Sequence, residues 1–329
     1  MRKAVALIAA ILLLTIPAYA ARSDNYSITT RVDKARDIVV FESNVLTAEI
    51  SGKRPSIRFY YTGDRLNLTH FKVSLEKIVE YDENLEVVQE CDVESWTGIY
   101  GNPTPIISGE GSEVGIGVHQ ALLKYPSIPF LIVFTEFSMY YSNFTETRQV
   151  GALSLTTTTL GAVELKTTIR IVDWPFKNPE TGRLALVFRI EKEIVGETAE
   201  QHHFTLNRGG DQDVLHIVGD DTKVEEGLVR WSNNALMSNA TDYYLTPIEA
   251  ANLNETDHDA KLILVYGRMH TNVARMFEQI LTIGVVEENA EFIVHPTPPT
   301  ITPEIILTAA AVTLAVLAVI VVKARPKKG

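Results

Sequence analysis

Apolar and polar residues alternate with a period of two over much of residues 24–294. Residues 71–81 show the pattern well, and similar runs cover residues 163–171 and 184–190. One phase of residues 71–81 holds Phe71, Val73, Leu75, Lys77, Val79 and Tyr81, and the other holds Lys72, Ser74, Glu76, Ile78 and Glu80. Successive side chains of a β-strand point to opposite faces, so the pattern predicts strands with one face on a core.

Two further runs, residues 129–141 and 261–266, are apolar in both phases and are typical of central strands. Polar turns at residues 82–84 and 177–182 each predict a hairpin between the runs that they join. Residues 273–281 are the exception, because their apolar positions fit helical spacing behind Asn272 as well as a strand. A short helix and a strand both stay open there.

Many strands with short connections predict an all-β fold, a large antiparallel β-sandwich over residues 21–294. Residues 101–115 and 207–213 are rich in glycine and polar residues and are the places where two subdomains would separate. We prefer one domain, because single β-domains of about 200–250 residues are common.

The first twenty residues predict a secretory signal peptide. Arg2 and Lys3 precede an apolar run of about 13 residues, which is too short to span a bilayer comfortably. Ala18 and Ala20 then form a small-residue cleavage site. We therefore expect residues 1–20 to be removed.

Residues 304–322 predict one C-terminal transmembrane helix, because the run 305–322 is uncharged and about 27 Å long as a helix. The basic tail 323–329 follows and should stay cytoplasmic. Residues 295–303 contain four prolines and three threonines, which is typical of an extended stalk. Pro303-Glu304, the apolar run and the basic end together resemble sorting signals cleaved by archaeosortase-type and exosortase-type transpeptidases. That resemblance implies processing of the helix, which is the alternative to the plain anchor that we predict.

Charge adds a constraint on partners. The whole chain carries a net charge of −11, and residues 21–303 alone carry −16, because six of the 30 basic residues lie in the two ends. Such a surface disfavours nucleic acid, which requires clustered Lys and Arg.

Five sequons predict N-glycosylation of the ectodomain: Asn25, Asn67, Asn143, Asn239 and Asn254. The single cysteine, Cys91, excludes an intrachain disulfide; it is expected to be a buried thiol, the alternative being an intermolecular bridge. A large secreted domain without disulfides, a short basic tail and sequons look like an archaeal cell-surface protein.

The chain contains no G-x-S-x-G, H-E-x-x-H, Walker or dinucleotide-binding motif. Residues 90–94, however, place Glu90, Asp92 and Glu94 in one phase of a strand. This string resembles the E-x-D-x-E strand of laminarinase-type glycoside hydrolases, which are also β-sandwiches. The resemblance implies that Glu90 is the nucleophile, Asp92 its assistant and Glu94 the acid/base.

Three features depart from that family. Gln89 replaces the usual glycine, and Cys91 stands where an aliphatic residue is expected. A straight strand also separates the backbones of Glu90 and Glu94 by about 13 Å, whereas a retaining enzyme holds its carboxyl groups about 5 Å apart. The alternative is a solvated acidic strand face without chemistry.

Acidic turns are candidates for Ca²⁺ binding through oxygen ligands, although we expect no cofactor to be required. They contain Asp211, Asp213, Asp220, Asp221, Asp257 and Asp259. Trp174 and Phe176, in the turn after residue 172, either close the end of the core or form an exposed aromatic platform.

The sequence therefore predicts a single-pass protein of the cell membrane, with its N-terminal ectodomain outside and its C-terminus cytoplasmic. We expect a non-enzymatic role in envelope structure, adhesion or the binding of a protein or glycan partner. The alternative is a surface glycoside hydrolase that uses Glu90, Asp92 and Glu94.

Overall fold

The computed structural model describes residues 27–51, 54–62, 69–93, 97–107, 113–123, 132–141, 143–150, 153–160, 163–194, 202–208, 212–219, 225–238, 243–256, 259–268 and 276–285. All of them belong to a compact unit that ends at Glu288, and Asn289–Gly329 form a second unit outside the described residues. The described residues form 21 strands, and every strand pairing is antiparallel. The prediction of an antiparallel all-β fold is confirmed.

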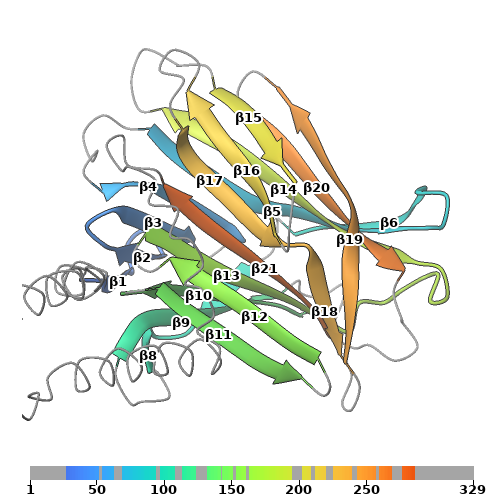
Figure 1. Cartoon of the computed structure of the whole chain (residues 1–329), viewed down its shortest axis with the longest axis horizontal. Helices are drawn as coiled ribbons and strands as arrows, with labels where there is room; N and C mark the ends of the chain where they lie inside the picture. The colour runs from blue at the N-terminus through green and yellow to red at the C-terminus, as the bar shows by residue number, and fades with distance from the viewer. Residues whose placement is uncertain are drawn as a thin grey trace, which may run out of the picture. The chain divides into compact units, whose positions relative to one another are not determined.

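The first sheet, sheet A, runs in the order β1, β2, β3, β4, β5, β14, β20, β19 (Figure 1). Strand β6 pairs with the second half of β5, on the side that β4 occupies beside the first half. The strands are β1 (Thr29–Asp33), β2 (Ile38–Glu42), β3 (Leu46–Ser51), β4 (Ser56–Tyr61), β5 (Thr69–Tyr81), β6 (Val87–Asp92), β14 (Arg183–Ile194), β19 (Tyr243–Glu255) and β20 (Asp259–Arg268).

The second sheet, sheet B, runs in the order β9, β10, β13, β21, β17, β16, β15. Strands β7 and β8 both pair with β9, and β18 pairs with the start of β21. The strands are β7 (Thr97–Tyr100), β8 (Thr104–Ile107), β9 (Glu113–Leu123), β10 (Ile132–Tyr140), β13 (Glu164–Val172), β15 (His202–Asn207), β16 (Gln212–Gly219), β17 (Glu225–Ser232), β18 (Asn234–Ser238) and β21 (Met276–Val285).

Sheets A and B share one hydrophobic core. Phe59, Phe188 and Leu264 reach it from sheet A, and Phe137 and Trp231 reach it from sheet B. Strand β19 joins the sheets, because its first residues pair with β18 and its later residues with β20. Two sheets packed around a common core fit the predicted sandwich. A separate hairpin of β11 (Asn143–Val150) and β12 (Leu153–Leu160) lies over sheet B in Figure 1.

Three predictions about local structure were decided by strand pairing. Residues 82–86 connect β5 and β6 as the predicted hairpin, closed by the Asp82 amide on the Glu86 carbonyl at 2.9 Å. The hairpin predicted at residues 177–182 is wrong: β13 pairs with β10 and β21, and β14 pairs with β5 and β20, so this connection crosses between sheets. Residues 276–285 form strand β21, which decides between the helix and the strand in favour of the strand.

The alternation predicted for residues 71–81 holds only for the first half of β5. Phe188 pairs with Leu75 but its neighbour Val187 pairs with Lys77, so Glu76 is an extra residue on β5. Such a bulge reverses the side-chain phase beyond it. Ile78 therefore joins the main core, whereas Val79 turns to the outer face of sheet A.

No helix among the described residues is long and apolar enough to cross a membrane. The predicted signal peptide, stalk, transmembrane helix and basic tail all lie outside the described residues.

Candidate functional site

A buried carboxylate lies at one end of the core. Glu80, near the end of β5, is 0% exposed, and it follows Ile78 on the face that points toward sheet B. Placing a carboxylate in such an environment costs free energy unless polar groups compensate it. The surroundings of Glu80 supply that compensation.

Four residues donate hydrogen bonds to Glu80. Gln89 Nε2 on β6 donates at 2.6 Å, and Trp174 Nε1 donates at 3.4 Å. The backbone amides of Lys177 and Asn178 donate at 3.0 and 2.8 Å. Charge-assisted bonds to a carboxylate are among the stronger hydrogen bonds in proteins. Glu80 therefore fixes the connection between β13 and β14 against the β5–β6 hairpin.

The β13–β14 connection is shaped to meet this carboxylate. It leaves β13 at Asp173, which adopts a left-handed backbone conformation with φ of 54°. It closes on Gly182, whose amide donates to the Asn178 carbonyl at 2.7 Å. A Cβ at Gly182 would lie 2.6 Å from that carbonyl oxygen and 3.1 Å from Glu80 Oε1. Gln89 Nε2 also donates to the Pro175 carbonyl at 2.8 Å.

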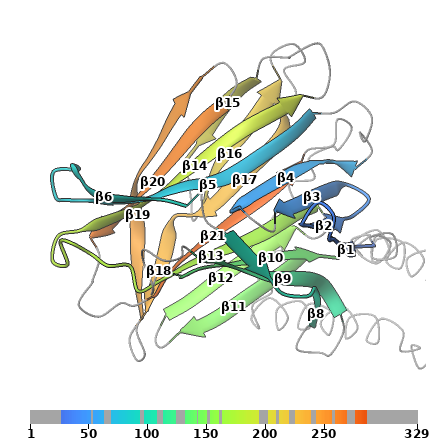
Figure 2. The same cartoon turned by 180° about the vertical axis from the view of Figure 1, so that it is seen from behind.

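The β5–β6 hairpin projects beside this connection at the same end of the domain (Figures 1 and 2). Asp82 Oδ1 organises its turn by accepting from the amides of Asn84 and Glu86 at 2.8 and 2.9 Å. Leu85 has a left-handed φ of 63°, and its side chain is 51% exposed. Val87 is 57% exposed. The hairpin thus presents two apolar side chains to solvent.

Acidic residues surround these two apolar side chains in sequence. Glu83, Glu86, Glu90 and Asp92 are all exposed. We call the described residues 82–92 and 173–182 the latched loops, because Glu80 holds the two segments together. Their surface combines two exposed apolar side chains with a surplus of carboxylates.

Two of the three hydrolase-like carboxylates fall on the hairpin. Glu90 and Asp92 pair in register with Val79 and Lys77 on the outer face of sheet A. Both are exposed, and each carboxylate oxygen of Glu90 accepts from Lys77 Nζ at 3.2 Å. The pKa of Lys77 is raised, chiefly by this bond. Glu94 lies outside the described residues.

One cavity among the described residues lies away from Glu90 and Asp92. It is an apolar space of about 30 Å³ between sheets A and B, and neither Glu90 nor Asp92 lines it. Its lining comprises Pro55, Ile57, Val73, Leu75, Phe137, Thr167, Ile169, Phe188, Leu281 and Ile283. A space of this size accommodates about one water molecule and no sugar ring.

The candidate calcium ligands are only partly described. Asp213 is buried at 7% exposure on β16. Asp259 accepts from Arg189 Nε at 2.8 Å and from the Thr256 hydroxyl, and the Thr256 bond is the larger cause of its lowered pKa. Asp211, Asp220, Asp221 and Asp257 lie outside the described residues. Within the described part of the chain, no three His, Cys, Asp or Glu residues gather as a metal site.

The other singled-out residues are placed as follows. Trp174 and Phe176 are partly buried and pack against the core, as expected of residues that close its end. Cys91 is a buried free thiol, which confirms that prediction. Asn254 is exposed on β19, and Asn143 begins β11. Asn25, Asn67 and Asn239 fall outside the described ranges, and use of the sequons stays a prediction.

Members of a charged cluster on sheet B form ion pairs with one another. Arg170 binds Glu278 at 2.7 Å and Glu136 at 3.1 Å, and Arg230 binds Glu164 at 2.7 Å. The side chains of Glu278 and Glu164 are each 3% exposed, so they depend on these partners. We assign this cluster to the stability of the outer face of sheet B.

Sequence reasoning missed Glu80. Strict alternation assigns it to the solvent face, opposite Phe71 and Leu75, and only the extra residue at Glu76 turns it inward. One signal was available in the sequence: Ile78 is apolar although it alternates in step with the polar residues Glu76 and Glu80. An apolar residue in the predicted polar phase is a sign that a bulge precedes it.

Comparisons with known proteins add little to this geometry. No family model matches the sequence, and no curated protein matches it. Six chains of solved structures match this one. One is a protein provisionally named a kojibiose phosphorylase, from the human microbiome, with 10% identity and a TM-score of 0.28 over 79% of this chain. The match covers 34% of that protein, so this chain spans about a third of its length. A likeness this low carries no argument about function.

Proposed function

We propose that this chain is a single-pass protein of the cell surface whose β-sandwich ectodomain binds a protein partner through the latched loops and catalyses no reaction. One observation carries the proposal: buried Glu80 uses bonds to Gln89, Lys177 and Asn178 to hold two loops together. Preorganised loops lose less conformational entropy when a partner binds.

The surface that these loops present supports a protein partner. Leu85 and Val87 are each more than half exposed at a hairpin tip. Exposing two neighbouring large apolar side chains to water is unfavourable in an isolated domain and favours burial by a partner. The surrounding carboxylates favour a partner with basic residues around an apolar spot, because complementary charge speeds association and selects the partner.

The membrane part of the proposal rests on the sequence. The apolar run 305–322, the basic tail 323–329 and the signal-like residues 1–20 support an ectodomain that faces outward. Asn84 is exposed in the hairpin turn and offers a place for a short epitope tag. Tagged full-length protein should be stained by antibody on intact cells; staining only after permeabilisation would contradict the proposed topology.

Binding is tested in the full chain on cells with a photo-crosslinking amino acid at position 87. We expect a discrete protein adduct from position 87 and none from position 107, where Ile107 is 60% exposed on β8. The adduct should fall several-fold in Glu80→Gln, because the loops are no longer fixed. Equal adduct yields from positions 87 and 107 would contradict the proposed interface. An adduct yield at position 87 that does not change in Glu80→Gln would contradict it too.

The hydrolase alternative has its own test. The same protein is assayed on soluble β-1,3-glucan before and after the substitutions Glu90→Gln and Asp92→Asn. We expect no hydrolysis in any form, because Glu90 is exposed and engaged by Lys77. Hydrolysis that both substitutions abolish would replace the non-enzymatic proposal.

A further inference from the structure

The charge of the ectodomain is unevenly distributed. Residues 27–62 contain six basic and four acidic residues, whereas residues 63–303 contain 17 basic and 35 acidic residues. Strands β1 to β4 lie within residues 27–62. The first strands therefore form a locally cationic region on an otherwise acidic domain.

The register brings these cations to one face. Arg31 on β1, Val40 on β2, Glu49 on β3 and Arg58 on β4 follow one another across sheet A as directly opposite residues. Directly opposite residues of antiparallel strands point to the same face. Their neighbours Val39, Ile50 and Ile57 belong to the core, so this row lies on the opposite face of sheet A, where Val40 itself is 0% exposed.

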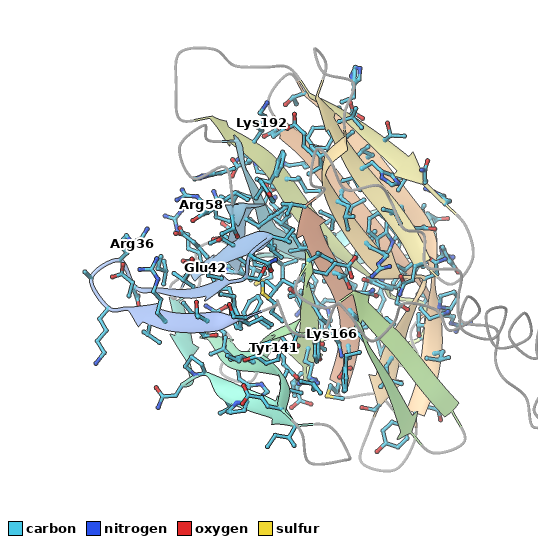
Figure 3. All side chains as sticks on the ribbon, turned by 60° about the vertical axis from the view of Figure 1, so that its left-hand side comes forward. Arg36, Glu42, Arg58, Tyr141, Lys166 and Lys192 are labelled. Carbon is cyan, nitrogen blue, oxygen red and sulfur yellow. The ribbon has the colours of Figure 1, made fainter. Side chains whose placement is uncertain are left out.

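A third guanidinium reaches the row from the β1–β2 turn. Arg36 lies 3.4 Å from Glu49 Oε1, and Arg58 lies 3.6 Å from Glu49 Oε2. Figure 3 shows Arg36 at the turn, on the same side of the molecule as Arg58. Arg36 also binds Asp33 at 2.8 Å. Arg31 is exposed and forms no ion pair with any described residue. Arg31 consequently keeps guanidinium donors that face solvent.

An aromatic pair adjoins these guanidinium groups. Tyr60 and His70 stack with their ring centroids 4.2 Å apart and their planes at 18°. Tyr60 lies two residues beyond Arg58 on β4 and therefore shares its face. Burial is the main cause of the raised pKa of Tyr60; the charge of Glu49 adds to the rise, and the charges of Arg31 and Arg36 oppose it.

We propose that Arg31, Arg36 and Arg58 together with the Tyr60–His70 stack form a binding site for an acidic oligosaccharide that carries uronic-acid carboxylates. Guanidinium groups bind carboxylates through paired, charge-assisted hydrogen bonds. Aromatic rings offer an apolar surface to the face of a sugar ring. The predicted cell-surface position makes such glycans accessible to the ectodomain.

Charge also selects among possible ligands. A short acidic saccharide would meet chiefly the cationic region, whereas a nucleic acid or an anionic bilayer would also meet the acidic residues of 63–303 and be repelled. The site is separate from the latched loops, which lie near Glu80.

The experiment uses the full chain in nanodiscs of zwitterionic lipid and titrates it with trigalacturonate and, as the neutral counterpart, with maltotriose. We expect trigalacturonate to bind at least tenfold more tightly, and its affinity to fall as salt rises. Arg58→Gln should weaken trigalacturonate binding by about tenfold, the loss typical of one charge-assisted contact. Tyr60→Ala should weaken it by about threefold to tenfold, because the ring surface is lost. Arg31→Gln should weaken it measurably without affecting folding, since Arg31 is exposed.

Arg183→Gln is the matched control. It removes a guanidinium that pairs with Glu249 on the same sheet, where Arg183 lies in register with Tyr81 rather than beside Tyr60. Binding should be unchanged in this variant. Equal binding of both saccharides, no binding of trigalacturonate, or equal losses in Arg183→Gln and Arg31→Gln would each overturn the proposal. Adsorption of the protein to phosphatidylglycerol vesicles through Arg31 without saccharide binding would overturn it too.

Discussion

The carboxylate of Glu80 accepts a hydrogen bond of 2.8 Å from the backbone amide of Asn178, a residue 98 positions later in the chain. One buried side chain on β5 thereby fixes a connection that crosses between two sheets. If Glu80 were absent, the amides of Lys177 and Asn178 and the side chains of Gln89 and Trp174 would lose this acceptor. The stability of this end of the domain therefore depends on a single charge.

The substitution Glu80→Gln should destabilise the domain by about 2–3 kcal/mol, because it removes a charge that accepts several hydrogen bonds and leaves buried donors unpaired. The measurement is urea unfolding followed by tryptophan fluorescence, which also reports the environment of Trp174. Glu90→Gln is the control and should change stability by less than about 0.5 kcal/mol, since Glu90 is exposed. Equal losses of stability in the two variants would show that Glu80 does not hold the two loops together.

The substitution Gly182→Ala should destabilise the domain by about 1–3 kcal/mol, because its Cβ would lie 2.6 Å from the Asn178 carbonyl oxygen. Gly101→Ala is the matched control, since the nearest atom to its Cβ is 3.8 Å away. Thermal unfolding monitored by circular dichroism compares the two. A normal melting temperature for Gly182→Ala would mean that the connection has room to rearrange.

Deletion of Glu76 should leave the later residues of β5 on their present faces. It removes the extra residue, so Lys77 would follow Leu75 directly and still pair with Val187, and Ile78 and Glu80 would still point inward. We expect a folded variant that unfolds cooperatively. Glu76→Ala removes an ion pair with Lys261 at 3.1 Å and should cost less than about 1 kcal/mol. Urea unfolding followed by tryptophan fluorescence compares the two variants, and a deletion variant that fails to fold would show that the bulge itself is required.

Asp259 should contribute stability that depends on pH. Its pKa is lowered from 3.8 in the folded chain, first by the Thr256 hydroxyl and then by Arg189. A lowered carboxylate pKa stabilises the fold above the unfolded value, and this contribution is lost as pH falls through the folded pKa. Asp259→Asn should therefore cost about 0.5 kcal/mol at pH 7 and less at pH 3. A cost that does not change with pH would assign the effect to packing.

The local pattern of apolar and polar residues was sufficient to predict several of the strands. Alternation identified the first half of β5, the strand β13 and the strand β14, because each has one face on the core. The runs that are apolar in both phases became β10 and β20, which lie between two neighbours each. Cys91 was expected to be buried, and it is.

The candidate site could not be predicted in the same way. The sequence drew attention to Glu90 and Asp92, whose spacing resembles a catalytic strand, yet both are exposed. Glu80 looked like a solvent residue and is 0% exposed. Its partners come from β6 and from a connection more than 90 residues away, and no local pattern records such a distance.

The sequence by itself determined that the chain is built of β-strands, because apolar residues with a period of two lie on one face in that conformation. It also determined the charge, −16 over residues 21–303, and the absence of an intrachain disulfide. Only the tertiary structure decided which face of β5 is buried beyond Glu76, and that β13 and β14 belong to different sheets. The physical reason is that hydrogen bonds and packing with distant strands stabilise the bulge and the sheet crossing. A short stretch of sequence contains none of those distant partners, so it cannot reveal either feature.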